Sequence, residues 1–201
     1  MEANSGRDPV ALKEWAVTVK ALQEGHLILV MRKGGIIEET RDFQLVSKGF
    51  YLMPAYEHQK EHLLKDAYQG QIQGTMHGWT PDMPSIKLGS YAEAVEDIEI
   101  TDQETLDRLR DYHIWTDTFA EERLKWKRTK PLHLLLLRVY LLEEPVELPM
   151  QPAYNGCKSW VRLNEGMPQP AMTPVLSDKE FERRVSLIKQ ALIGRDISES
   201  S

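Results

Sequence analysis

The segment that most constrains the fold is residues 132–142, LHLLLLRVYLL. Its apolar side chains fall on both faces of an extended chain, whereas a strand with one face in water alternates apolar and polar residues. We therefore predict a central strand that is covered on both sides. The rest of the chain must supply the partners that cover it.

Residues 9–35 combine a predicted helix, a predicted strand and a basic loop. Pro9 suits the first position of a helix, and Gly25 is a typical C-terminal stop. Lys13 and Glu14 are expected to form a pair on the exposed surface of this helix. Residues 27–31 follow as a short buried strand. Five apolar residues share the predicted inner helix face: Leu12, Trp15, Ala16, Val19 and Leu22.

The remaining sequence predicts further strands and helices, separated by proline, glycine and capping signals. Asp42–Ser47 and Phe50–Met53 are expected to pair, and residues 55–68 to form a helix. Residues 69–84 resemble a long loop, and Pro145 and Pro149 mark a turn. Further strands are expected at the ends of residues 86–100 and at 159–163. Helices are expected after Thr101, over about residues 116–127 and after Ser177.

This inventory of roughly five to seven strands and three or four helices does not alternate between strand and helix. We therefore predict an α+β fold, with a small mixed, curved sheet or barrel and peripheral helices. The expected organisation is a flexible N-terminus (1–8), one α+β domain (9–166), a proline-rich linker (167–176), a C-terminal helix (177–194) and a disordered tail (195–201).

Composition indicates a soluble globular protein. The 201 residues carry a net charge of −6, and no apolar run approaches the length of about 18 residues that spans a bilayer. The N-terminus has no apolar signal segment. A single cysteine, Cys157, excludes an internal disulfide and a cysteine-cluster zinc site. We expect a cytoplasmic protein with no membrane partner.

Cations and aromatic residues indicate nucleic acid as a partner. An acidic stretch, residues 93–122, precedes a basic run that surrounds Trp126, and a local basic field can attract a polyanion to an acidic protein. An aromatic ring between cations suits stacking on a base. The candidate nucleic-acid-binding residues are Arg32, Lys33, Tyr56, His58, Arg123, Lys125, Trp126, Lys127, Arg128, Lys130, Lys158 and Trp160.

Catalytic motifs are weak. No lysine has an acidic residue two positions before it, so the Glu/Asp-x-Lys element of restriction-type nucleases is missing. Phosphate-loop, dinucleotide and serine-nucleophile motifs are absent as well. We expect no cofactor, no metal ion and no catalytic residue. The alternative is a metal-dependent nuclease or other hydrolase that uses Asp42, Glu57 and His58.

Four blocks of sequence resemble a bacterial family, domain of unknown function 1802. They are Ala11-Leu-Lys-Glu-Trp15, Leu29-Val-Met-Arg-Lys-Gly-Gly-Ile36, Leu52-Met-Pro-Ala-Tyr-Glu-His-Gln59 and Gly156-Cys-Lys-Ser-Trp160. The family has no assigned activity. Its members are sometimes fused to a restriction-endonuclease-type domain, which implies a link to restriction or DNA handling. The opening of the chain also resembles PUA-like domains of the ASCH and EVE type, some of which read modified bases.

These observations favour a nucleic-acid-recognition module over an enzyme. Its partner is expected to be DNA or RNA, with a nuclease or another protein as a possible second partner. Arg32, Lys33, Tyr56, His58 and Trp160 are expected to lie near one pocket, with the basic run guiding the strand. A protein-interaction module that uses the acidic stretch is the second alternative.

Overall fold

The computed structural model describes residues 9–33, 43–126, 130–164, 167 and 170–194. Within them the strands are β1 (Val10–Trp15), β2 (Leu29–Arg32), β3 (Gly49–Ala55), β4 (Ser85–Ile100), β5 (Leu132–Pro149), β6 (Trp160–Arg162) and β7 (Met172–Pro174). The α-helices are α1 (Ala16–Gln23), α2 (Gln71–Thr75), α3 (Gln103–Asp107), α4 (Asp117–Lys125) and α5 (Asp178–Leu192).

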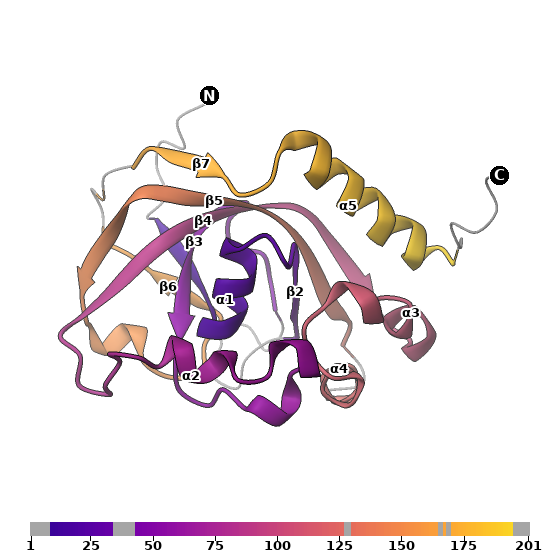
Figure 1. Ribbon diagram of the computed structural model, residues 1–201, viewed down its shortest axis with the longest axis horizontal. Helices are drawn as coiled ribbons and strands as arrows, with labels where there is room; N and C mark the ends of the chain where they lie inside the picture. The colour runs from indigo at the N-terminus through magenta and orange to yellow at the C-terminus, as the bar shows by residue number, and fades with distance from the viewer. Residues whose placement is uncertain (1–8, 34–42, 127–129, 165–166, 168–169, 195–201) are drawn as a thin grey trace.

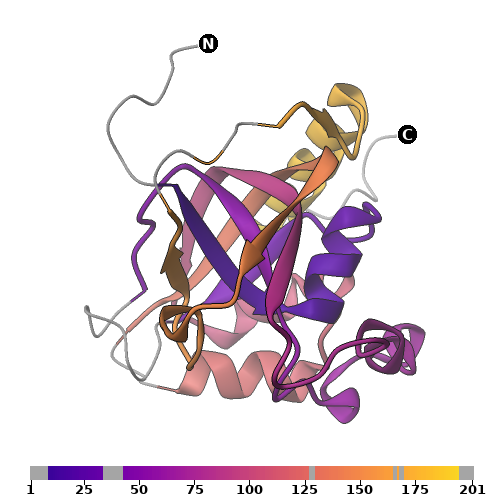
Figure 2. The ribbon, with the colours of Figure 1, turned by 90° about the vertical axis from the view of Figure 1, so that its left-hand side faces the viewer.

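The seven described strands form one sheet in the order β2-β5-β4-β3-β1-β6, with β7 paired to β5. Most neighbours are antiparallel, whereas β1 and β3 run parallel. The long β4–β5 pair shifts register at two places, and such bulges bend a sheet. Figures 1 and 2 show the resulting curvature, with helices at the periphery. The expected mixed α+β class with a curved sheet is confirmed.

The central position predicted for residues 132–142 is confirmed, because β5 lies between β2 and β4. Its side chains from Leu134 to Leu137 are completely buried. The predicted strand before Arg32 also exists, and β2 pairs with β5 in an antiparallel register that sets Arg32 opposite His133. The core is thus built around the segment that the sequence marked most strongly.

The first predicted helix is wrong in its first half. Residues 10–15 form β1, and only Ala16–Gln23 are helical. Val10, Ala11 and Leu12 are all buried, which an amphipathic surface helix does not allow but a strand covered on both faces does. The pairing of β1 with β3 and β6 supplies hydrogen bonds that no local pattern reveals.

Other predicted elements also differ from the structure. Residues 43–47 form no strand, and Asp42 lies outside the described residues. The expected helix over residues 55–68 is replaced by two short 3₁₀ turns, Glu61–Leu63 and Asp66–Tyr68. Pro145 and Pro149 lie within β5 and do not form a turn. The predicted loop 69–84 contains the short α2.

The C-terminal segment is anchored to the sheet. β7 lies within the predicted linker and pairs with Tyr140–Leu142 of β5. In α5, Phe181 and Ile188 are buried, and Ser177 caps the helix by accepting a hydrogen bond from the Glu180 backbone N–H. The domain boundaries at 166 and 177 stay predictions. None of the helices in the described part of the chain combines the length and the apolar composition needed to cross a bilayer.

Candidate nucleotide-binding cavity

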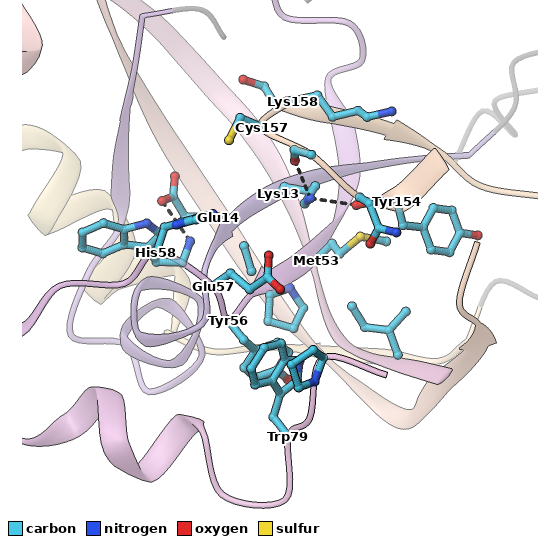
Figure 3. Close-up of a pocket in the computed structure, with 18 of the residues that line it drawn as sticks. Lys13, Glu14, Met53, Tyr56, Glu57, His58, Trp79, Tyr154, Cys157 and Lys158 are labelled. Carbon is cyan, nitrogen blue, oxygen red and sulfur yellow. Dashed lines mark hydrogen bonds between the residues drawn. The ribbon is translucent and has the colours of Figure 1, made fainter. Parts of the chain in front are cut away.

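A cavity of about 860 Å³ lies where β1 and β3 end. Because these strands are parallel, their carboxyl ends meet at the same edge of the sheet. The residues that end or follow them, from Lys13 to Trp15 and from Met53 to His58, line the cavity. Segments from β4, α4 and residues 154–159 complete the wall (Figure 3).

All four sequence blocks that carried the family resemblance contribute to this cavity. The first supplies Lys13, Glu14 and Trp15, the second Arg32, the third residues 53–58 and the fourth residues 156–159. Blocks that served only the core would be scattered through the fold. The four blocks thus converge on one cavity.

The side chains of Glu14 and Arg32 form a buried ion pair in the wall. Arg32 Nη1 donates to Glu14 Oε2 at 3.0 Å, and the two side chains are 13% and 5% exposed. Arg32 Nη2 also donates to the Ser159 hydroxyl, next to β6. These bonds connect the two end strands of the sheet order, since Arg32 ends β2 and Ser159 precedes β6. The expected surface pair of Lys13 and Glu14 is therefore wrong.

Arg123 adds a second guanidinium beside this pair. It lies over the Phe119 ring, 5.0 Å from the centroid, and Nη1 donates to the Met31 carbonyl at 3.4 Å. Burial lowers the pKa of Arg123 to about 10, a shift that nearby Arg32 increases and Glu14 opposes. The residue still carries a positive charge at neutral pH. Two arginines thus share the charge of Glu14, which favours an anionic ligand.

Lys13 holds the loop of residues 154–156, which also lines the cavity. Its Nζ donates to the Tyr154 carbonyl at 2.7 Å and to the Gly156 carbonyl at 2.9 Å. Burial lowers the pKa of Lys13. An ammonium group has three donors, so one N–H is left for a ligand. Figure 3 shows Lys13 between Tyr154 and the labelled Glu57.

Aromatic rings form the lower part of the cavity in Figure 3, where Tyr56 and Trp79 lie together. Their rings are stacked, with centroids 5.6 Å apart and an interplanar angle of 20°. Burial raises the pKa of the Tyr56 hydroxyl, so that it stays neutral. Trp15, Phe119 and Trp126 line the same cavity.

The loop that carries Tyr56, Glu57 and His58 is attached to α1. The Val17 N–H, in the first turn of α1, donates to Gln59 Oε1 at 2.9 Å, while Gln59 Nε2 donates to the Tyr56 carbonyl at 3.2 Å. Gln59 therefore supplies the cap that α1 lacks from its own N-cap residue. His58 adopts a left-handed backbone with φ 65°.

The structure places the sequence-predicted binding residues in different environments. Six of them line the cavity: Arg32, Tyr56, His58, Arg123, Trp126 and Lys158. Lys33 is 2% exposed and donates to the Leu124 carbonyl. Trp160 packs against Phe43 and Phe50 in the core and donates to the Gln44 carbonyl at 2.8 Å.

The predicted basic run is not one continuous surface in the described residues. Arg123 points to the Phe119 ring, whereas Lys125 forms an exposed pair with Glu121. Lys130 is exposed. Lys127 and Arg128 lie outside the described residues. Whether this run guides a nucleic-acid strand stays a prediction.

The sequence analysis missed Lys13, Glu14 and Trp15 as site residues, because it placed them on a helix. A charged Lys-Glu pair inside an otherwise apolar family block was the available signal. For the alternative metal site, the described residues contain no cluster of three or more His, Cys, Asp and Glu side chains. Glu57 and His58 line the cavity, and Asp42 lies outside the described part, so that alternative stays a prediction.

Comparisons with known proteins add a family and a structural similarity. Residues 11–187 match the model of the family described as Domain of unknown function (DUF1802). No curated protein matches the sequence. Among solved structures, the chain is similar to the ASCH protein from Zymomonas mobilis, at 15% identity and a TM-score of 0.40, over 90% of this chain and 96% of that chain. A serine-to-alanine mutant of that protein matches at 16% identity, a TM-score of 0.40 and the same coverage.

Proposed function

The chain belongs to the DUF1802 family, and we propose from the geometry of its cavity that it binds an unpaired nucleotide of a DNA or RNA strand. The observation that carries this proposal is that one cavity joins aromatic faces to cationic side chains, with all four family blocks contributing. Single-stranded nucleic acids are commonly bound by that combination, because bases stack on aromatic rings while cations neutralise phosphates.

The two kinds of side chain have separate roles in this proposal. The outer face of the Tyr56–Trp79 pair is the stacking surface, because the two rings already contact each other and leave no gap between them. Lys158 lies on the opposite wall from this pair in Figure 3. In this proposal its ammonium group contacts the phosphates of the strand. The half-buried Arg32 and Arg123 keep the inner wall positive despite the net charge of −6.

A cavity of this kind favours single strands over a duplex. A paired base is stacked on its neighbours and cannot reach a ring inside a cavity unless it is unpaired and rotated out, which costs a few kcal/mol. An already unpaired base avoids that cost. We therefore expect single strands to bind more tightly than blunt duplexes of the same sequence.

Fluorescence anisotropy with labelled single-stranded RNA, single-stranded DNA and a blunt duplex tests the proposal. Tyr56→Ala and Trp79→Ala are each expected to weaken single-strand binding by about 5- to 150-fold, which corresponds to ~1–3 kcal/mol of stacking. Trp79→Phe should restore most of the affinity, because it keeps a ring. Tyr140→Ala is the matched control, since Tyr140 is half-buried and does not line the cavity.

The proposal fails if no strand binds, or if both alanine variants bind as tightly as the wild type. Thermal unfolding of each variant shows whether a loss of binding reflects a loss of fold. The finer expectations, a link to restriction or DNA handling, a nuclease partner and a cytoplasmic location, rest on the family resemblance and composition and belong to this proposal.

A further inference from the structure

We propose that the base which this cavity selects is guanine, recognised along its Watson–Crick edge by Glu57 and Lys13. This inference rests on the proposed function and adds to it a base identity. The juxtaposition that carries it is a carboxylate that pairs with none of the described residues and an ammonium group, both in one cavity that also holds the Tyr56–Trp79 stacking surface.

Glu57 is suited to contact a ligand. It follows Tyr56 directly, lines the cavity and is exposed. Its carboxylate makes no hydrogen bond or ion pair with the described residues. Glu14 and Glu147, which line the same cavity, differ: the first is bound to Arg32, and the second accepts a hydrogen bond from the Ser85 hydroxyl at 2.5 Å. Glu122 also lines the cavity, but it belongs to α4 and precedes Arg123 in the sequence, whereas Glu57 directly follows Tyr56 of the stacking surface.

Lys13 provides a donor next to this acceptor. Its two hydrogen bonds to the Tyr154 and Gly156 carbonyls fix the ammonium group and leave one N–H. No described carboxylate lies within ion-pair distance of it, yet the charge of Glu57 acts on it and opposes the lowering of its pKa by burial. Figure 3 shows the Glu57 carboxylate between Lys13 and the Tyr56–Trp79 pair in that view.

A carboxylate can accept a single hydrogen bond from several bases. A donor beside a carboxylate that accepts two parallel hydrogen bonds matches the Watson–Crick edge of guanine alone among the common bases. The Watson–Crick edge of guanine presents an acceptor, O6, followed by two donors, N1–H and the N2 amino group. Lys13 can donate to O6 while the two Glu57 oxygens accept from N1–H and N2–H, and hydrogen bonds that involve a charged partner are the stronger kind.

The other bases leave the carboxylate facing an acceptor. Uracil and thymine offer one donor, N3–H, between two carbonyl oxygens. Adenine and cytosine offer an amino group followed by an unprotonated ring nitrogen. Each can therefore donate to only one Glu57 oxygen and places a lone pair against the other. A polar group is then left without a partner, which is the arrangement that rejects a ligand most strongly.

Binding of uridine-rich single strands that carry one central guanine, adenine, cytosine or inosine tests this inference, with RNA and DNA versions measured separately. The guanine strand is expected to bind about tenfold or more tightly than the adenine and cytosine strands. Inosine lacks the N2 amino group and should fall between them. Competition with free GMP and AMP shows whether a free nucleotide suffices or a strand is needed.

Glu57→Gln is the decisive variant. It should weaken binding of the guanine strand by about tenfold, because an amide replaces a charged acceptor and turns a donor toward the base, and leave the other strands within about twofold. Glu147→Gln, a carboxylate at the same cavity, is the matched control and should preserve the preference.

Equal affinities for the four strands in a wild-type protein that binds them overturn the guanine inference and leave the proposed function intact. A guanine preference that Glu57→Gln retains also overturns it. Absence of binding to every strand and to both nucleotides overturns the inference and the proposed function together.

Discussion

Arg32 donates to the Glu14 carboxylate across 3.0 Å, in a pair that joins the last residue of β2 to β1. The same guanidinium bonds to Ser159 beside β6, so one side chain links the two end strands of the sheet order. The charge of Glu14 also acts on nearby Arg123 and opposes the lowering of its pKa by burial. Glu14 is thus the acidic centre of a buried cluster whose cations line the cavity.

Glu14→Gln is expected to lower the free energy of unfolding by about 3 kcal/mol, because removing one partner of a buried pair leaves the other charge uncompensated. Urea denaturation at neutral pH measures this. Glu121→Gln is the control, since its pair with Lys125 is exposed and such pairs contribute at most about 1 kcal/mol. Equal, small effects of the two variants would show that Arg32 and Arg123 do not need Glu14.

His113 predicts a loss of stability in mild acid. Burial lowers the pKa of this 5%-exposed imidazole from 6.5 to about 4, with nearby Lys65 adding to the shift. The unfolded chain therefore takes up the proton at a higher pH than the folded chain does. The free energy of unfolding should fall as the pH drops from 6.5 to 4, by about 3 kcal/mol in total from this residue.

Chemical denaturation of the wild type and of His113→Gln over that pH range tests this expectation. Glutamine does not titrate, so the free energy of unfolding of the variant should fall less than that of the wild type as the pH drops. Parallel stability curves would contradict it. Taking the difference cancels the carboxylates that titrate in both proteins.

Because His58 has a left-handed backbone, we expect glycine to be more stabilising than alanine at this position, which is the reverse of the usual order. At φ 65° a glycine avoids the steric cost that a side chain with a Cβ incurs, so His58→Gly should be more stable than His58→Ala by about 1 kcal/mol. At neighbouring Glu57, which is not among the positive-φ residues, the alanine variant should be the more stable one. Thermal unfolding of the four variants checks both orders, and the same order at both positions would argue against strain at His58.

Lys158 predicts a change in the salt dependence of binding. Each phosphate neutralised on a single strand contributes about −0.7 to the slope of log affinity against log salt. Lys158→Ala should therefore reduce the magnitude of the slope by about that amount, for every strand sequence alike. Lys179→Ala, an exposed lysine on α5 that does not line the cavity, should leave the slope unchanged. An unchanged slope in both variants would remove Lys158 from the phosphate contacts.

Local signals identified the elements whose stability depends on neighbouring residues in the sequence. Ser177 caps α5 and Thr116 caps α4, as their positions before charged first turns indicate. The apolar residues of β5 required a central strand, because exposing either face would leave several leucines in water. Three of the six candidate binding residues that line the cavity do so for a related reason. Tyr56, His58 and Lys158 follow or precede strands, where polar side chains meet at a sheet edge.

Only the tertiary structure decided that Val10–Trp15 forms a strand and that its last residues line the cavity. The apolar spacing from Leu12 to Leu22 fits a helix. The strand is favoured instead by hydrogen bonds to β3, about forty residues later, and to β6, near residue 160, and a local pattern does not contain these distant partners. Those pairings turned Lys13 and Glu14 from an expected surface pair into cavity residues. The sequence by itself determined the core strands β2 and β5 and the N-terminal caps of α4 and α5, which depend on near neighbours. The cavity depends on contacts between segments far apart in the chain, and only their pairing brings its charges together.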